Sequence, residues 1–217
     1  MFPLNDKIEF PPVHLADEEG LLAFGGDLSA ERLLLAYRSG IFPWFNDDEP
    51  PLWWSPDPRF VLFPQQLYVS KSMQQLLKRR AFKLTMNKAF TEVVRQCGRQ
   101  KRKGQEGTWI TNEIEEAYSE LHQLGHAVSL EAWKGKELVG GLYGIRMGKF
   151  FFGESMFAKV SNASKYAFIA FVQQLQKEGV LLIDCQVYTQ HLESLGARMI
   201  QRAEFIKLLN ENIETTT

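Results

Sequence analysis

A carboxylate lies inside an aromatic segment of the chain, where a charge is unusual. The segment Phe150–Phe157 reads Phe-Phe-Phe-Gly-Glu-Ser-Met-Phe, which puts Glu154 directly after Gly153. A buried charge is costly unless it is paired, and a glycine inside a strand often marks a place where a ligand comes close. Either the strand ends at Gly153 with Glu154 turned to solvent, or Glu154 belongs to a polar binding site.

A second apolar segment, residues 181–187, carries Asp184 and Gln186. Side chains alternate between the two faces of a strand, so these two share one face and their apolar neighbours share the other. If the two segments are neighbouring strands, Glu154, Asp184 and Gln186 form a polar site on an apolar floor. This second segment therefore favours a binding site over a solvent-facing carboxylate.

The composition bounds the kind of protein. The chain has 217 residues, 45% of them hydrophobic and 24% charged, enough for one large domain or a small domain joined to a larger one. No apolar run approaches the ~20 residues of a membrane span, and the first residues lack the pattern of a secretory signal. The two cysteines and four histidines do not combine at zinc-ligand spacing. We therefore expect a cytoplasmic protein that uses no metal and no membrane.

Charge is strongly segregated along the chain, although the net charge is only −1. Residues 1–60 carry four basic and eleven acidic side chains, a balance of −7, whereas residues 71–103 carry eleven basic side chains and one acidic, a balance of +10. Such a basic block is typical of a surface that binds a polyanion, such as a nucleic acid. The alternative is a solvated helical face followed by a basic loop, with no partner.

Three of the five tryptophans, Trp44, Trp53 and Trp54, fall within eleven residues and are bracketed by prolines. Prolines exclude a regular helix in this stretch. The cluster is either a small aromatic core that fixes an irregular segment or a rigid surface on which a base can stack. Different tryptophans can serve each purpose, so both interpretations stay open.

The elements that would position these residues follow from hydrophobic periodicity and turn signals. Three strands joined by tight turns are followed by a helix and a returning strand, which is an α+β order. This order resembles that of the GNAT acyltransferase fold. We expect strands at residues 82–86, 126–133, 137–146, 149–157 and 180–187, and helices at residues 29–38, 71–79, 90–97, 111–124, 161–176 and 203–210.

Five motifs occur in order along the chain: Gly-Ile-Phe-Pro-Trp-Phe at 40–45, Trp-Trp-Ser-Pro-Asp-Pro-Arg at 53–59, Glu-Gly-Thr-Trp-Ile-Thr at 106–111, Phe-Gly-Glu-Ser-Met-Phe at 152–157 and Ile-Asp-Cys-Gln-Val at 183–187. Together they resemble the bacterial leucyl/phenylalanyl-tRNA–protein transferases, from about Gly20 to Leu209. The resemblance implies a small N-terminal domain, residues 1–62 with the Trp- and Pro-rich loops. A GNAT-like catalytic domain, residues 63–217, would follow, with a mostly antiparallel sheet and flanking helices.

The resemblance implies an aminoacyltransferase. Such an enzyme moves Leu or Phe, and Met less well, from aminoacyl-tRNA to the N-terminal Arg or Lys of a protein, which marks that protein for degradation in the N-degron pathway. Its partners would be Leu-tRNA or Phe-tRNA and the acceptor protein, with no cofactor, and it would act as a monomer. An aminoacyl ester is already activated, so the enzyme has only to hold an amine against it and manage one proton.

The resemblance also assigns roles to residues. Asp184 would orient and polarise Gln186, whose carbonyl oxygen accepts a hydrogen from the attacking amine. Glu154 would orient the reacting groups and favour a basic first residue in the acceptor. The terminal adenosine of the tRNA would lie on Trp44 and Trp109. The amino-acid pocket would comprise Leu142, Phe151, Met156, Phe171 and Ile183, and charge alone assigns the tRNA phosphates to Lys71, Lys78, Arg79, Lys101, Arg102 and Lys103.

Two other classes of function stay open. A CoA-dependent N-acyltransferase of the same fold would carry a glycine-rich pyrophosphate loop after the strand at 149–157, and the sequence has none there. A non-catalytic module would bind aminoacyl-tRNA without transferring its amino acid. Within the family pattern, Leu142 stands where Met is expected, which predicts a small change in the preference between Leu and Phe.

Overall fold

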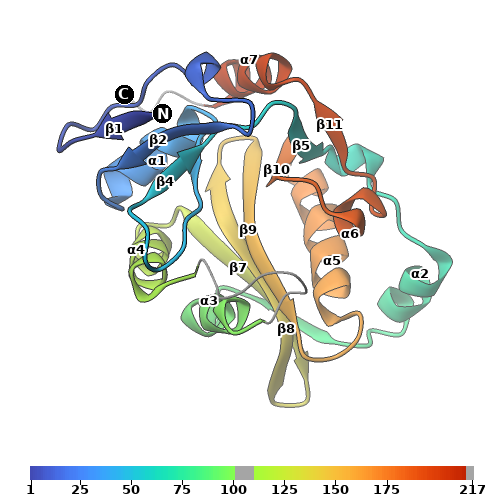
Figure 1. Cartoon of the computed structure of the whole chain (residues 1–217). Helices are drawn as coiled ribbons and strands as arrows, with labels where there is room; N and C mark the ends of the chain where they lie inside the picture. The colour runs from blue at the N-terminus through green and yellow to red at the C-terminus, as the bar shows by residue number, and fades with distance from the viewer. Residues whose placement is uncertain (101–109, 214–217) are drawn as a thin grey trace.

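A meander of three long antiparallel strands, joined by tight turns, forms the centre of the molecule (Figure 1). β7 (Ala127–Lys134), β8 (Glu137–Met147) and β9 (Phe150–Ala158) pair in sequence order. Gly135 and Gly148 in the two turns have φ values of 62° and 49°, a left-handed conformation that suits a residue without a side chain. The predicted meander is confirmed in this computed structural model, which describes residues 1–100 and 110–213.

The meander is extended on both sides into a seven-stranded sheet of order β11-β5-β10-β9-β8-β7-β6. β6 (Lys83–Met86) pairs with β7, and β10 (Leu182–Gln186) pairs with β9. β5 (Arg59–Leu62) and β11 (Arg198–Ile200) complete the other edge. Neighbouring strands are antiparallel except β9 and β10. These two are parallel because helix α5 (Ala163–Lys177) connects them across one face of the sheet.

A smaller sheet forms near the N-terminus, with the strand order β1-β2-β4-β3. Its first pair is parallel and the other pairs are antiparallel. The mixed α+β class predicted from the sequence is confirmed, and the closer likeness to the GNAT fold stays a prediction. The strands are β1 (Phe2–Leu4), β2 (Leu21–Gly25), β3 (Phe42–Pro43) and β4 (Leu52–Trp54).

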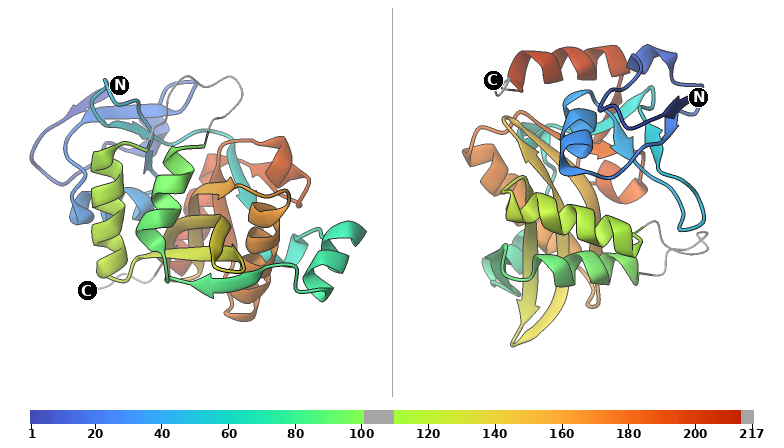
Figure 2. Two further views of the ribbon diagram at one scale, coloured as in Figure 1. Left: turned by 90° about the horizontal axis from the view of Figure 1, so that it is seen from below. Right: turned by 90° about the vertical axis from the view of Figure 1, so that its left-hand side faces the viewer.

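The large sheet separates two hydrophobic cores, with helices on both of its faces (Figure 2). One face carries α5 and, beside it, α2 (Lys71–Lys78). The other face carries α3 (Phe90–Gly98), α4 (Asn112–Gln123), the small sheet with α1 (Ala30–Arg38), and α7 (Arg202–Asn212). Because β9 is covered on both faces, all three of its consecutive phenylalanines are buried.

The helix ends follow the capping rules in part. The Ser29 and Thr111 hydroxyls accept the backbone N–H three residues on, so each of these residues caps its helix. At the start of α5, Asn162 occupies the N-cap position with a left-handed φ of 68° and makes no side-chain cap bond.

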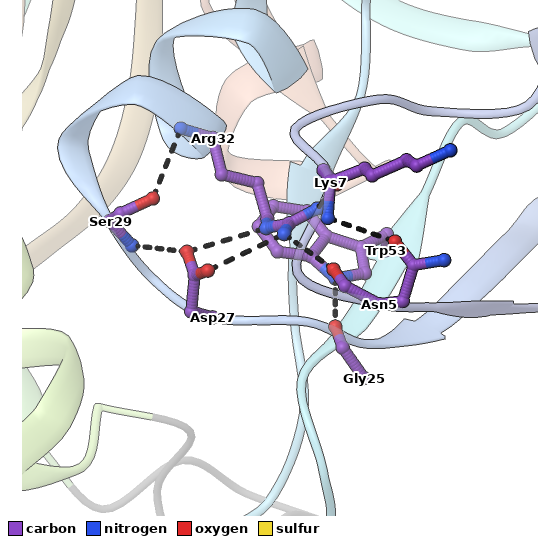
Figure 3. A network of polar contacts seen from close by, with 7 residues as sticks. All are labelled: Asn5, Lys7, Gly25, Asp27, Ser29, Arg32 and Trp53. Carbon is purple, nitrogen blue, oxygen red and sulfur yellow. Dashed lines mark hydrogen bonds and ion pairs between the residues drawn. The ribbon is translucent and has the colours of Figure 1, made fainter.

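A buried arginine ties the N-terminal segment to the small sheet and to α1 (Figure 3). The Arg32 guanidinium donates to the carbonyl oxygens of Asn5 and Lys7 at 2.8 and 3.1 Å, and it pairs with Asp27 at 3.3 Å. Nearby, the Trp53 indole donates to the carbonyl oxygen of Gly25 at 2.9 Å. These bonds satisfy a fully buried cation, and they anchor the backbone of residues 5 and 7.

Several short elements were not predicted from the sequence. Residues 59–62, which the sequence analysis placed at the end of the N-terminal domain, form β5 inside the seven-stranded sheet. Four or fewer residues give too little alternation for a strand prediction, which explains why β5 and β11 were missed. The division into two domains stays a prediction. Among the helices of residues 1–100 and 110–213, none combines the length and the apolar character needed to cross a membrane.

Candidate active site

The three polar residues singled out in the sequence come together at the contact between β9 and β10. The parallel register sets Phe152 beside Asp184, so Glu154 and Gln186 lie close to each other further along the two strands. The Gln186 side-chain amide donates to Glu154 Oε1 at 3.0 Å. β9 continues past Gly153 and Glu154 is only 8% exposed, so the interpretation that turned Glu154 to solvent is wrong.

β10 is irregular at its end. Gln186 has a φ of 64°, a left-handed conformation that is uncommon for any residue but glycine, and the pairing with β5 shifts between Asp184 and Gln186. The Gln186 backbone N–H donates to Asp184 Oδ1 at 2.9 Å. The described contact between the two residues therefore runs through the backbone, while Glu154 holds the Gln186 side chain.

Glu154 is surrounded by hydrogen-bond donors. The Tyr118 hydroxyl, from α4, donates to Glu154 Oε2 at 2.9 Å and is itself in contact with the Tyr37 hydroxyl, from α1. Burial raises the pKa of Glu154 to about 7, and the charge of Asp184 adds to the rise, whereas hydrogen bonds from both tyrosines and from Gln186 oppose it. Burial also raises the pKa of Tyr37 and of Tyr118, so both hydroxyls stay protonated.

Asp184 forms a buried ion pair with Arg59, an arginine to which the sequence analysis assigned no role. Arg59 Nε and Nη2 donate to the two Asp184 oxygens at 2.9 and 2.6 Å, and both side chains are fully buried. The guanidinium carbon lies 4.7 Å from the ring centre of Phe42 and 4.8 Å from that of Phe205. An ionised carboxylate inside an apolar strand is costly unless it is paired. The arginine at the start of the apolar stretch 59–62 was therefore the residue in the sequence that could have been identified as the partner of Asp184.

A cavity of about 330 Å³ opens beside these residues. Glu154, Asp184 and Gln186 form part of its wall. Four of the five residues predicted for the amino-acid pocket line it: Leu142, Phe151, Met156 and Ile183.

The fifth predicted pocket residue, Phe171, lies behind the wall. Its ring packs edge-on against Phe151 at a centroid distance of 4.9 Å, and it is absent from the lining, where Phe168 of the same helix takes part instead. Two residues that sequence reasoning missed, Phe42 and His191, also line the cavity. Burial lowers the pKa of His191, with the charge of Lys165 acting in the same direction.

The tryptophans divide between the two interpretations left open above. Trp53 is fully buried and packs edge-on against Phe10 at 4.9 Å, so it belongs to a structural core. Trp44 lines the cavity and remains 38% exposed, and its ring lies 5.9 Å from that of Trp54. Trp109, the second tryptophan expected to hold an adenosine, lies outside the described residues.

The basic residues predicted to meet phosphates are described only in part. Lys71 and Lys78 of α2 and Arg79 directly after it are exposed. Helix α2 lies beyond α5 at the edge of the molecule (Figure 1). Three others fall outside the described residues: Lys101, Arg102 and Lys103. In residues 1–100 and 110–213, no group of three or more His, Cys, Asp or Glu side chains is placed to hold a metal ion.

An apolar cavity with a few convergent polar groups defines a protein that holds a small group, or the end of a larger molecule, in a fixed orientation. The model of the family described as "Leucyl/phenylalanyl-tRNA protein transferase" matches residues 61–210, and the model of the N-terminal domain of the same family matches residues 26–57. The chain belongs to this family, and the resemblance inferred from the five motifs is confirmed.

Relatives with the same name are similar over almost the whole chain. The leucyl/phenylalanyl-tRNA--protein transferase of Flavobacterium johnsoniae is 60% identical, covering 96% of this chain and 99% of that protein. Those of Christiangramia forsetii and Syntrophobacter fumaroxidans are 58% and 53% identical; the matches cover 96% and 98% of this chain, and 100% and 91% of those proteins. The solved structure of L-PGS from Bacillus licheniformis has a TM-score of 0.44 at 14% identity, covering 82% of this chain and 57% of that one.

Proposed function

We propose that this chain moves Leu or Phe, and Met less well, from aminoacyl-tRNA to the N-terminal Arg or Lys of a protein. Family membership supports the reaction, and the observation that carries the site assignment is the contact between Gln186 and Glu154 in the wall of an apolar cavity. The modified protein is then marked for degradation in the N-degron pathway. The enzyme works as a monomer in the cytoplasm and needs no cofactor.

The reaction exchanges one bond for another. The acceptor's neutral α-amine attacks the ester carbonyl, the new C–N bond forms, and the C–O bond to the ribose breaks. The amine loses one proton and the ribose oxygen gains one, so no metal, ATP or covalent enzyme intermediate is required. Holding the two substrates in a reactive geometry provides most of the acceleration, because correct orientation alone is worth several orders of magnitude in rate.

Gln186 directs the amine. Its NH₂ group donates to Glu154, which leaves the carbonyl oxygen to accept a hydrogen bond from the attacking nitrogen. Positive charge develops on this nitrogen during attack, and a nearby carboxylate, Glu154, stabilises it. The same carboxylate favours an acceptor whose first side chain is basic.

The donor occupies the rest of the cavity. Its Leu or Phe side chain fills the apolar part that Leu142, Phe151, Met156 and Ile183 line. The terminal adenosine stacks on Trp44 at the exposed rim, together with Trp109. The phosphates of the tRNA meet six basic residues: Lys71, Lys78, Arg79, Lys101, Arg102 and Lys103.

One assay tests the proposal against its alternatives. Labelled Leu-tRNA is mixed with a peptide that begins with Arg, and label is counted in the peptide; the same peptide beginning with acetylated Arg is the control. Label in the free peptide alone supports the proposal. Binding of Leu-tRNA without transfer would indicate a binding module, and acyl transfer from acetyl-CoA would indicate a CoA-dependent enzyme.

A further inference from the structure

Among the described residues, Arg59 is the one basic side chain that contacts an acidic residue of the site, Asp184. The reaction proposed above assigns no role to it. Its side chain is fully buried behind the cavity wall. We propose that Arg59 is a positioning residue for aminoacyl transfer: through Asp184 it holds the left-handed turn that aims the Gln186 carbonyl oxygen at the acceptor amine. This inference rests on the proposed function.

Arg59 and Asp184 form an ion pair with a fixed geometry. Two guanidinium nitrogens of Arg59 meet the two oxygens of Asp184 in a paired arrangement, at 2.9 and 2.6 Å. A planar guanidinium that binds both oxygens fixes the plane of the carboxylate as well as its position, which a lysine cannot do.

The fixed Asp184 carboxylate in turn holds the backbone of Gln186. Asp184 Oδ1 accepts the backbone N–H of Gln186 at 2.9 Å, two residues on. Gln186 adopts a φ of 64°, which is rare for a residue with a side chain and persists only where the surroundings hold it. The hydrogen bond to Asp184 acts at this residue, and its direction depends on the carboxylate plane that Arg59 sets. The Gln186 side chain leaves this turn toward Glu154.

Arg59 is itself held in place by aromatic rings and by contacts of the segment that precedes it. Phe42 and Phe205 lie on the guanidinium, and Phe42 also lines the cavity. The segment before Arg59 is tied to α7, because Arg202 donates its backbone N–H to Asp57 Oδ1 at 2.9 Å and its side chain to the Ser55 carbonyl oxygen at 2.5 Å. The third guanidinium nitrogen, Nη1, is buried and finds no hydrogen-bond partner among the described residues. Arg59 thus gives up one hydrogen bond and keeps the two that orient Asp184.

A matched control exists in the same chain. Arg32 is also fully buried and also pairs with an aspartate, but its contacts are with residues 5, 7 and 27, and it is absent from the cavity wall. Replacing either arginine by lysine keeps the charge and removes the paired geometry. A purely structural role predicts the same behaviour for both variants, whereas the positioning role predicts a difference in turnover.

The test measures transfer from Leu-tRNA to the Arg-starting peptide. Thermal unfolding of each variant gives its melting temperature and folded fraction, and turnover is expressed per folded molecule. Arg59→Lys is expected to lower kcat at least ~10-fold, since small misplacement of a reacting group is costly, and to leave KM for Leu-tRNA within about twofold. Arg32→Lys is expected to lower the melting temperature and leave kcat unchanged. Equal kcat for Arg59→Lys and the wild type would overturn the inference.

A double-mutant cycle shows whether Arg59 acts through Gln186. In a Gln186→Ala background, Arg59→Lys is expected to cause no further loss of kcat, because the group it aims is gone. The same fractional loss in both backgrounds would contradict the inference. If Arg59→Lys does not fold, Arg59→Met combined with Asp184→Asn removes both charges together and enters the same cycle. An inactive wild type would instead reject the proposed function, which separates the two failures.

Discussion

The side-chain amide of Gln186 donates to Glu154 Oε1 at 3.0 Å, across the contact between strands β10 and β9. This bond turns the nitrogen end of the amide toward the carboxylate and leaves the carbonyl oxygen as the free acceptor. Gln186 reaches this position because its backbone is left-handed, with a φ of 64°. The orientation of the amide therefore depends on two strands and on a local irregularity of one of them.

Replacing Gln186 by Ala should lower turnover about 10- to 100-fold, because the amine loses the acceptor that orients it. Binding of Leu-tRNA should change little. Steady-state transfer and a separate tRNA-binding titration measure the two effects. The four single His→Ala variants serve as comparisons, including His191, which lines the cavity. If these histidine variants lost transfer and Gln186→Ala were normal, the assignment would be wrong.

Replacing Tyr118 by Phe should move the pH profile of transfer. The Tyr118 hydroxyl lowers the pKa of Glu154, so its loss raises that pKa above the value of about 7. The ionised carboxylate is the active form, and the acid limb of the profile should shift to higher pH by several tenths of a unit or more. Tyr166→Phe, in the other core, is the control and should keep the wild-type profile. Comparing variants with one peptide removes the contribution of the amine's own titration.

Replacing Glu154 by Gln should abolish most transfer and yet stabilise the fold at alkaline pH. The pKa of Glu154 rises from 4.5 to about 7 on folding, so the native state binds this proton more tightly. This tighter proton binding stabilises the native state fully below pH 4.5, and the stabilisation is lost as the pH rises toward 7. Because the glutamine side chain of the variant does not titrate, the free energy of unfolding of Glu154→Gln should rise relative to that of the wild type by about 3 kcal/mol between these pH limits. Denaturant unfolding at pH 4.5 and pH 8 measures the gain; equal differences at both pH values would refute it.

The sequence alone predicted the features of the site that follow from local patterns, and it missed those that depend on contacts between distant residues. The meander and the polar residues in β9 and β10 were predicted, because strand alternation and tight turns are local. The alternation argument placed Asp184 and Gln186 on one face, but the bulge between them separates their side-chain partners, Arg59 and Glu154. A bulge depends on tertiary contacts and interrupts the two-residue alternation of a strand, so the sequence pattern does not reveal it.

Arg59 and Tyr118 were missed for a related reason. Arg59 lies 125 positions before its partner Asp184, and Tyr118 lies 36 positions before Glu154. Tyr118 lies on the apolar face of α4, so the hydrophobic periodicity identified it as a core residue and did not indicate a role for its hydroxyl. Arg59 is the last residue of the motif at 53–59. A charged residue next to an apolar stretch is typical of the end of a buried segment, so it did not indicate a buried ion pair. Both residues become visible only when the strands and helices are assembled.

The cavity should select donors by shape. Its apolar part is lined by Leu142, Phe151, Met156 and Ile183. One methylene is worth only about 1–3 kcal/mol in such a pocket, so Leu, Phe and Met should all be accepted. Ile and Val should be poor donors, because branching at Cβ crowds the entrance. Transfer rates from the five aminoacyl-tRNAs check this, and similar rates for Val-tRNA and Leu-tRNA would contradict it.

The two expected RNA contacts should respond differently to salt. Lys78 and Arg79 would meet phosphates, which give an affinity that falls steeply with salt, whereas Trp44 would hold an adenine by stacking, worth about 1–3 kcal/mol and only weakly salt-dependent. The Lys78→Ala/Arg79→Ala variant should flatten the slope of log affinity against log salt for Leu-tRNA. It should leave leucyl-adenosine, which has no phosphate, nearly unaffected.

Trp44→Ala should show the opposite pattern, with both donors weakened by a similar factor at every salt concentration. Lys177→Ala/Lys207→Ala, on α5 and α7, is a control of equal charge change outside the basic block. Affinities of each variant for both donors at three salt concentrations give the comparison. If the basic variant of α2 weakened leucyl-adenosine as much as Leu-tRNA, the basic residues would have a structural role and the phosphate assignment would fail. A flattened slope confined to Leu-tRNA would place the tRNA body over α2, because only the donor that carries phosphates would respond.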